Sequence, residues 1–125
     1  MFETLDIFKT AAGAAEHASR RQALIAQNIA NADTPGYRGQ DVAPFADMMA
    51  EYDTPMRHTR TGHLQPTSMG AAAETVLSDG QTSPNGNTVS LETEMMKAAQ
   101  TRGQFDMAVG VYKSALNILK SSLGR

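Results

Sequence analysis

The C-terminal third of the chain carries the longest regular pattern of apolar positions. From Leu91 onward, apolar side chains recur in alternating steps of four and three residues, interrupted by Arg102. Such steps keep side chains on one face of a helix, because a turn takes about 3.6 residues. An average repeat of about 3.5 residues is typical of a coiled-coil seam. The pattern predicts a helix over residues 89–125 with the packing positions Leu91, Met95, Phe105, Val109, Tyr112, Leu116, Leu119 and Leu123.

A second stripe of apolar positions occupies the N-terminal segment. It also advances in steps of three and four residues and is interrupted by Gln22. Alanines between residues 11 and 15 favour helix and would let another helix approach closely. We therefore predict a helix from about residue 5 to residue 32 or 33, with the packing positions Phe8, Ala15, Ile25 and Ile29.

Pro35 and Gly36 mark the end of this first helix. A proline cannot continue a helix, and it disfavours helical geometry in the residue before it. The Pro-Gly pair suits the two central positions of a type II turn, because the second position requires positive φ. Residues 1–37 are thus expected to form one helix followed by a turn.

The middle of the chain, residues 38–88, has a different character. It is rich in proline and in turn-forming dipeptides such as Asp79-Gly80 and Asn85-Gly86, and its low apolar content favours mobility or folding on a partner. Residues 42–49 are compatible with a short helical turn. The predicted fold is therefore mainly α: two long terminal helices form an antiparallel coiled-coil pair, joined by an irregular, flexible segment with room for a short helix or small β element.

Composition narrows the functional classes. The 125 residues carry a formal charge of −2, so no basic surface field is available for nucleic acid or an anionic membrane. No segment approaches the roughly 18 apolar residues of a membrane span. The acidic N-terminus differs from a cleavable secretory signal, which begins with basic residues. One helix pair leaves apolar surface uncovered, which argues for assembly with other chains.

The sequence offers little for catalysis. His58 and His63 are two ligand candidates where a closed zinc site usually takes four, and His17 reads as a solvent or interface residue. Glu92 and Glu94 are explained by the dipole at the start of the last helix, with Ser90 as its cap. Neither a phosphate-binding glycine loop nor a nucleophile elbow is present. We expect no enzyme activity, no cofactor and no metal.

A more specific signal lies in residues 26–38. The pattern Asn-x-x-Asn followed by Thr-Pro-Gly-Tyr resembles the signature of bacterial flagellar rod, hook and hook-associated proteins, and residues 86–95 are similar to the segment that leads into their C-terminal helix. The short chain most resembles the basal-body rod proteins of the proximal rod, which include two sister types. The motif positions that the resemblance identifies are Asn28, Asn31, Thr34, Pro35, Gly36 and Tyr37.

The resemblance implies a function that composition does not. Members of this family are structural subunits that stack helically, with paired terminal helices forming a tube around the export channel. They are exported without a cleaved signal and assemble in the periplasmic space. The implied partners are other copies, other rod proteins, the adaptor at the rod base, the export gate and the surrounding membrane ring. Nucleic acid and small-molecule substrates are not implied.

Two alternatives stay open at this point. The chain could be a soluble helical adaptor or secretion chaperone that binds a partner helix. Within the motif, Asn28 and Asn31 could bond to a neighbouring subunit or merely cap the end of their own helix. A small enzyme is disfavoured because no group of side chains converges on a site.

Overall fold

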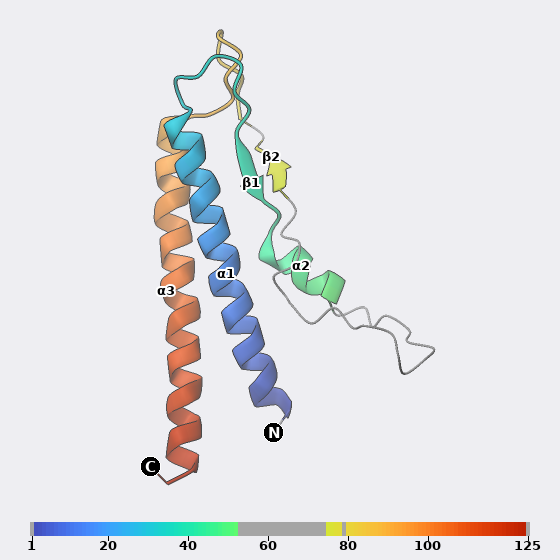
Figure 1. Cartoon of the computed structure of the whole chain (residues 1–125), viewed down its shortest axis with the longest axis vertical. Helices are drawn as coiled ribbons and strands as arrows, with labels where there is room; N and C mark the ends of the chain where they lie inside the picture. Colours follow the sequence, from blue (N-terminus) through green and yellow to red (C-terminus); the bar gives the residue numbers. More distant parts are fainter. Residues whose placement is uncertain (1, 53–74, 79, 125) are drawn as a thin grey trace, which may run out of the picture.

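Two long helices dominate the computed structural model, which describes residues 2–52, 75–78 and 80–124. The described elements, in chain order, are α1 (Phe2–Ala30), β1 (Gln40–Val42), α2 (Phe45–Tyr52), β2 (Thr75–Leu77) and α3 (Leu91–Ser122). Helices α1 and α3 pack side by side along most of their length and run in opposite directions, so both ends of the chain lie at one end of the pair (Figure 1). The predicted antiparallel pair of terminal helices is confirmed.

Helix α1 ends slightly earlier than the sequence predicts. Its last residue is Ala30, and residues 31–33 form turns instead of continuing the helix. The predicted turn follows: the amide of Tyr37 donates to the carbonyl oxygen of Thr34 at 3.3 Å, and Gly36 has φ of 71°. This positive φ is readily available to glycine, which explains why the residue after Pro35 is Gly36.

The contact between the two helices is built from small side chains. The buried apolar residues of the described chain are Ala11, Ala18, Ile25, Val42 and Ala108. Alanines on facing helices allow the two backbones to approach closely, since no bulky side chain separates them. On α3 the buried positions are Glu94, Thr101 and Ala108, spaced seven residues apart. The seven-residue spacing is that of a coiled-coil seam.

This buried face corrects the phase that the sequence assigned to α3. The predicted packing residues Leu91, Met95 and Leu123 are 49%, 61% and 79% exposed. Glu94, which the sequence assigns to the dipole at the start of this helix, is 3% exposed. The prediction assigned the largest apolar side chains of α3 to the contact with α1. The two helices approach closely, however, and this requires smaller residues at the contact. Leu91, Met95 and Leu123 are left available to other chains.

The remaining predicted packing positions lie at or beside the contact. Those partly buried in the single chain are Phe8, Ala15, Ile29, Phe105, Val109, Leu116 and Leu119. Tyr112 is 40% exposed, and its ring meets the ring of Phe8 edge-on with 5.1 Å between centroids. The two interrupting residues, Gln22 and Arg102, are exposed and lie outside the seam. This set of positions therefore describes the flank of the contact more than its centre.

The middle of the chain begins and ends in a small β-ribbon. Strands β1 and β2 pair antiparallel, with Gln40 opposite Leu77 and Val42 opposite Thr75. Helix α2 follows β1 directly and lies beside α1 (Figure 1). The expected short helix and small β element are both present. The further expectation of flexibility falls mainly on residues 53–74, which lie outside the described residues, as do His58 and His63.

His17 ties the segment before α2 to α1. Its side chain is 7% exposed, and its Nε2 donates to the carbonyl oxygen of Ala43 at 2.8 Å. The ring also lies against that of Phe45, with 5.6 Å between centroids. The reading of His17 as a solvent or interface residue is therefore wrong, because the chain itself covers it.

Replacing Ile25 by alanine tests the helix contact. Ile25 is 1% exposed, so Ile25→Ala leaves a cavity and should lower the free energy of unfolding by about 2–5 kcal/mol. Ile118, 68% exposed on α3, supplies the matched control, and Ile118→Ala should change stability by less than about 0.5 kcal/mol. Urea unfolding followed by circular dichroism measures both, and equal losses would contradict the assigned contact.

Candidate assembly motif and polar clasp

Asn28 lies in the last turns of α1 and is completely buried, with 0% exposure. Its amide nitrogen donates to the backbone carbonyl of Gln40 at 2.7 Å and to Oε2 of Glu94 at 2.9 Å. Its oxygen accepts the amide of Gln40 at 3.0 Å and the hydroxyl of Tyr37 at 3.3 Å. One side chain therefore joins α1, β1 and α3. The bonds it makes lie within the chain, which favours an internal role over a bond to a neighbouring subunit.

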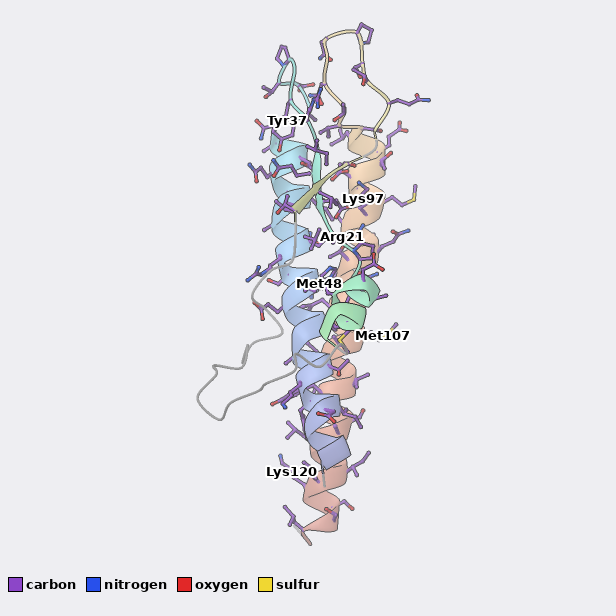
Figure 2. All side chains as sticks on the ribbon, turned by 90° about the vertical axis from the view of Figure 1, so that its right-hand side faces the viewer. Arg21, Tyr37, Met48, Lys97, Met107 and Lys120 are labelled. Atoms are coloured by element: carbon purple, nitrogen blue, oxygen red, sulfur yellow. The ribbon has the colours of Figure 1, made fainter. Side chains whose placement is uncertain are left out.

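Four charged side chains extend this junction. Arg21 forms a two-pronged bond with Asp41, from Nε to Oδ1 at 2.8 Å and from Nη2 to Oδ2 at 2.9 Å. The ammonium of Lys97 lies 2.9 Å from Oε1 of Glu94 and 3.5 Å from Oδ2 of Asp41. Arg21 and Lys97 both lie at the level of the β-ribbon (Figure 2). We call Arg21, Asn28, Asp41, Glu94 and Lys97 the polar clasp.

The polar clasp balances two carboxylates with two cations. Burial by itself raises the pKa of Asp41. Hydrogen bonds from Arg21 and from the Val42 amide, together with the charges of Arg21 and Lys97, have the opposite and larger effect. The pKa of Asp41 therefore lies below its ordinary value. The bond with Asp41 likewise raises the pKa of Arg21. Breaking one partner would leave a mostly buried charge unpaired, which is costly. The clasp therefore favours one register of α1, β1 and α3.

Asn87 performs a second task at the same end of the molecule. Its side chain is 1% exposed, and its amide nitrogen lies 3.0, 2.7 and 3.0 Å from the carbonyl oxygens of Asn31, Ala32 and Thr34. The last carbonyl groups of a helix and the turn beyond it have no partner within the helix itself. Its oxygen accepts the amide of Val89 at 2.7 Å. Asn87 thus caps the end of α1 from the segment that begins α3.

The two loops at this end meet through glycines. The amide of Gly36 donates to the carbonyl oxygen of Asn85 at 3.0 Å, and Gly86, with φ of 80°, lies against Gly36. A Cβ at Gly80 would lie 1.9 Å from the carbonyl oxygen of Thr88, so no side chain fits there. The close approach of these loops lets Asn87 reach the end of α1.

The structure brings most of the predicted motif residues together. Asn28, Tyr37 and the turn at Pro35-Gly36 lie at this end of the helix pair, where Pro35 and Gly36 are exposed. The side-chain amide of Asn31 donates to the carbonyl of Gln27 at 2.8 Å, and its oxygen lies 3.3 Å from the hydroxyl of Thr34. Asn31 therefore makes local capping bonds. A role of these residues in assembly stays a prediction.

Sequence reasoning missed the partners that complete the site. Arg21, Asp41, Asn87 and Lys97 were not singled out, and Glu94 was assigned to the helix dipole alone. Ser90 does occupy the position before α3, but its side chain makes no capping bond. The seven-residue spacing of Glu94, Thr101 and Ala108 could have indicated the buried face of α3. The larger apolar residues on other faces made this pattern hard to recognise.

The described residues contain no cluster of side chains suited to bind a metal ion. Among residues 2–52, 75–78 and 80–124, no group of three or more potential ligand side chains is placed to hold a metal ion. Within the same part of the chain, none of the helices combines the length and hydropathy needed to cross a bilayer. The chemistry of the clasp is that of satisfied hydrogen bonds and paired charges, which suits a structural role.

Substitutions of Asn87 test the cap. Asn87→Asp keeps the size of the side chain but directs carboxylate oxygens at three carbonyl oxygens, so it should destabilise the chain more than Asn87→Ala does. The alanine variant should cost about 1–3 kcal/mol, because part-buried carbonyl groups lose the donor that Asn87 supplies. Asn117→Ala, at an exposed position of α3, serves as the control. Equal stability of all three variants in urea unfolding would exclude the cap.

Acid titration tests the charge pairing of Asp41. Because its pKa in the folded chain lies below the ordinary 3.8, its stabilising contribution is complete above that value and is lost as pH falls through the folded-state pKa. Asp41→Asn should be less stable at neutral pH by roughly 1–3 kcal/mol and should lose less stability on acidification. Asp106→Asn, in an exposed ion pair, should behave like the parent chain when unfolding is followed across this pH range.

Comparisons with known proteins agree with the motif. The family model described as "Flagella basal body rod protein" matches residues 8–38, which include α1 beyond its first turns and the Pro-Gly turn. This match covers Asn28 and the other five predicted motif positions.

Curated relatives match over most of their length. The flagellar basal body rod protein FlgB of Agrobacterium fabrum is 30% identical over 118 residues, covering 90% of this chain and 88% of the relative. FlgB of Escherichia coli is 31% identical over 121 residues, with coverage of 82% and 85%. FlgB of Bacillus subtilis is 27% identical over 113 residues, with coverage of 88% and 87%.

The name of these relatives describes a structural protein and not an enzyme. The chain belongs to the FlgB family of flagellar basal body rod proteins.

Proposed function

We propose that this structural protein of the basal body rod polymerises through α1 and α3 into the tubular shaft around the export channel. The observation that carries the proposal is the large apolar surface that α3 leaves uncovered. Its exposed large apolar residues run along the whole helix and are Leu91, Met95, Met96, Met107, Val111, Tyr112, Ile118 and Leu123. A helix with this surface is suited to contacts on more than one side.

The size of the core supports the same proposal. Three of the five buried apolar residues of the described chain are alanines, so the helix pair removes little apolar area from water. Hydrophobic stabilisation scales with that area, at roughly 25 cal/mol per Å². Neighbouring copies in a rod would supply the missing burial. A chain with so small a core is also suited to export in an unfolded form, without a cleaved signal.

The proposed position is the proximal rod in the periplasmic space. There the chain would contact other copies, other rod proteins, the adaptor at the rod base, the export gate and the membrane ring. The clasp supports such a position because it fixes the level at which α1 ends and the chain turns outward. Subunits stacked in a tube need this exit at one height, so that the outward segment clears the subunit above.

A charge on the uncovered surface tests the proposal. Met95 is 61% exposed, so Met95→Asp should leave the helicity and stability of the isolated chain nearly unchanged. In a strain with no other copy, the same change should abolish rod assembly and swimming, because a desolvated carboxylate opposes contact with a neighbour. Asn117→Asp, at another exposed site of α3, should retain both.

The readouts are swimming in soft agar and detection of the tagged chain in purified basal bodies. Light scattering should find the isolated parent chain monomeric. A chain that is absent from basal bodies and forms a stable helical dimer in solution would contradict the rod proposal and support the adaptor alternative.

A further inference from the structure

One side of α3 carries a continuous uncharged ridge. Its large members, Met96, Met107, Val111 and Ile118, are 62%, 71%, 47% and 68% exposed. Met96, Met107 and Ile118 are spaced eleven residues apart, which is close to three turns of a helix, so they lie in one row along the axis. We call these four residues the α3 ridge. It is distinct from the seam that faces α1.

The positions between members of the α3 ridge are small or uncharged. They are Gln100, Gly103, Gln104 and Ser114, and all are exposed. The charged residues of this part of α3, including Arg102, Asp106 and Lys113, fall on the other side of the helix by its periodicity. Uncharged apolar rows of this length on an exposed helix face mark an interaction surface.

A groove of complementary character lies on the opposite side of the helix pair. It has a volume of about 650 Å³, and α1 lines it mainly with small residues such as Ser19, Ala23 and Ala26. Helix α3 contributes Thr101, Phe105 and the charged residue Arg102. The side chain of Thr101 is only 1% exposed, and its buried hydroxyl has no hydrogen-bond partner among the residues that the structure describes. Such groups are normally satisfied, so Thr101 is an independent indication that this groove is incomplete alone. We call it the α1 groove.

The small residues of the α1 groove belong to a longer row. Ala12, Ser19, Ala23, Ala26 and Ala30 are all exposed and recur in steps that keep them on one face of α1. Ala12 and Ala23 are eleven residues apart, as are Ser19 and Ala30. This is the spacing of the α3 ridge. A row of large side chains and a row of small ones with the same period can pack as ridge into groove.

We propose that the α3 ridge of one copy packs into the α1 groove of a second copy of this chain. The inference rests on the proposed rod function and names the surfaces that would join subunits. The α3 ridge is uncharged. The charged residues at or beside the α1 groove, Arg102 and Glu16, are exposed. They are paired with Asp106 and Arg20, so the contact would not desolvate an unpaired charge.

The two surfaces lie on opposite sides of the α1–α3 contact. The α3 ridge borders a second groove on the side of α2, lined by Phe45, Met107 and Val111, and Figure 2 shows Met107 beside α2. The α1 groove opens on the other side, between Ala23 and Phe105. One chain cannot join its own two surfaces, so the contact is head-to-tail. Contacts of this type generate rings or helical arrays.

The size of the contact explains how assembly would be controlled. A helix face from residue 96 to 118 is roughly 33 Å long and roughly 10 Å wide, which gives roughly 330 Å² per copy. Stable pairs bury about 800 Å² per partner. One such contact is therefore too small to hold a dimer in solution. In an array each copy makes the contact on both sides, and other rod contacts add to it.

Engineered cysteines test the contact directly, because the chain has no cysteine of its own. Ala23→Cys is combined in turn with Met96→Cys, Met107→Cys or Ile118→Cys, in a strain with no other copy. Purified basal bodies are treated with a short bismaleimide cross-linker and analysed on denaturing gels. At least one of the three pairs should convert the monomer band into a ladder of dimers, trimers and larger products.

Matched controls separate this contact from random proximity. Ala23→Cys combined with Lys113→Cys or with Lys120→Cys places the second cysteine on exposed α3 positions away from the ridge, and these pairs should stay monomeric. Ladders from the control pairs, or none from the three ridge pairs while the chain is present in basal bodies, would overturn the inference alone. Absence of the chain from basal bodies would overturn the proposed function and the inference together.

A filled groove provides a second measurement. Ala23→Leu places a large side chain in the α1 groove at an exposed position, so the isolated chain should keep its helicity while swimming and rod assembly are lost. Ala99→Leu makes the same change at an exposed site outside both surfaces and should swim normally. Normal swimming of both variants would contradict the proposed packing.

Discussion

The structure depends on the need to satisfy backbone carbonyl groups at the end of α1. A helix leaves its last carbonyls without donors within the helix, and here local amides reach only some of them, as Thr34 does for Asn31 and Tyr37 for Thr34. Asn87 supplies a further donor from more than fifty residues away in sequence, at distances of 2.7–3.0 Å. Because this amide belongs to the segment that leads into α3, satisfying α1 also fixes where α3 begins.

The polar clasp also fixes the position of α3 relative to α1, at a point further along the helix pair. Asn28 and Glu94 are buried between helices whose contact is otherwise formed largely by small residues, together with Ile25. A contact between small apolar side chains specifies register weakly, whereas a buried amide bonded to a carboxylate tolerates little sliding. Lys97 balances the charge that Glu94 brings into the contact, and Arg21 balances that of Asp41. Polar residues therefore specify the register of the two helices, and small residues allow the helices to approach closely.

Sequence reasoning succeeded where the determinants are local. The period of the apolar residues specified both long helices, and Pro35-Gly36 specified the turn between α1 and β1. It failed on the phase of α3, because that helix carries apolar residues on two sides and the larger ones, such as Met95 and Leu123, proved exposed. Asp41 and Asn87 could not be predicted as partners, since nothing local shows that β1 and the segment before α3 meet the end of α1.

The β-ribbon has a consequence for insertions into the middle of the chain. Its strands are paired from Gln40 with Leu77 to Val42 with Thr75, and Ser78 adds a bond to Gly39 at 2.8 Å. The chain therefore leaves the helix pair and returns to it at one anchored place. Because the ribbon holds both ends of the segment between α2 and β2, we expect inserted sequence there to leave the clasp unstrained. Segments of different length would then be compatible with the same helix pair.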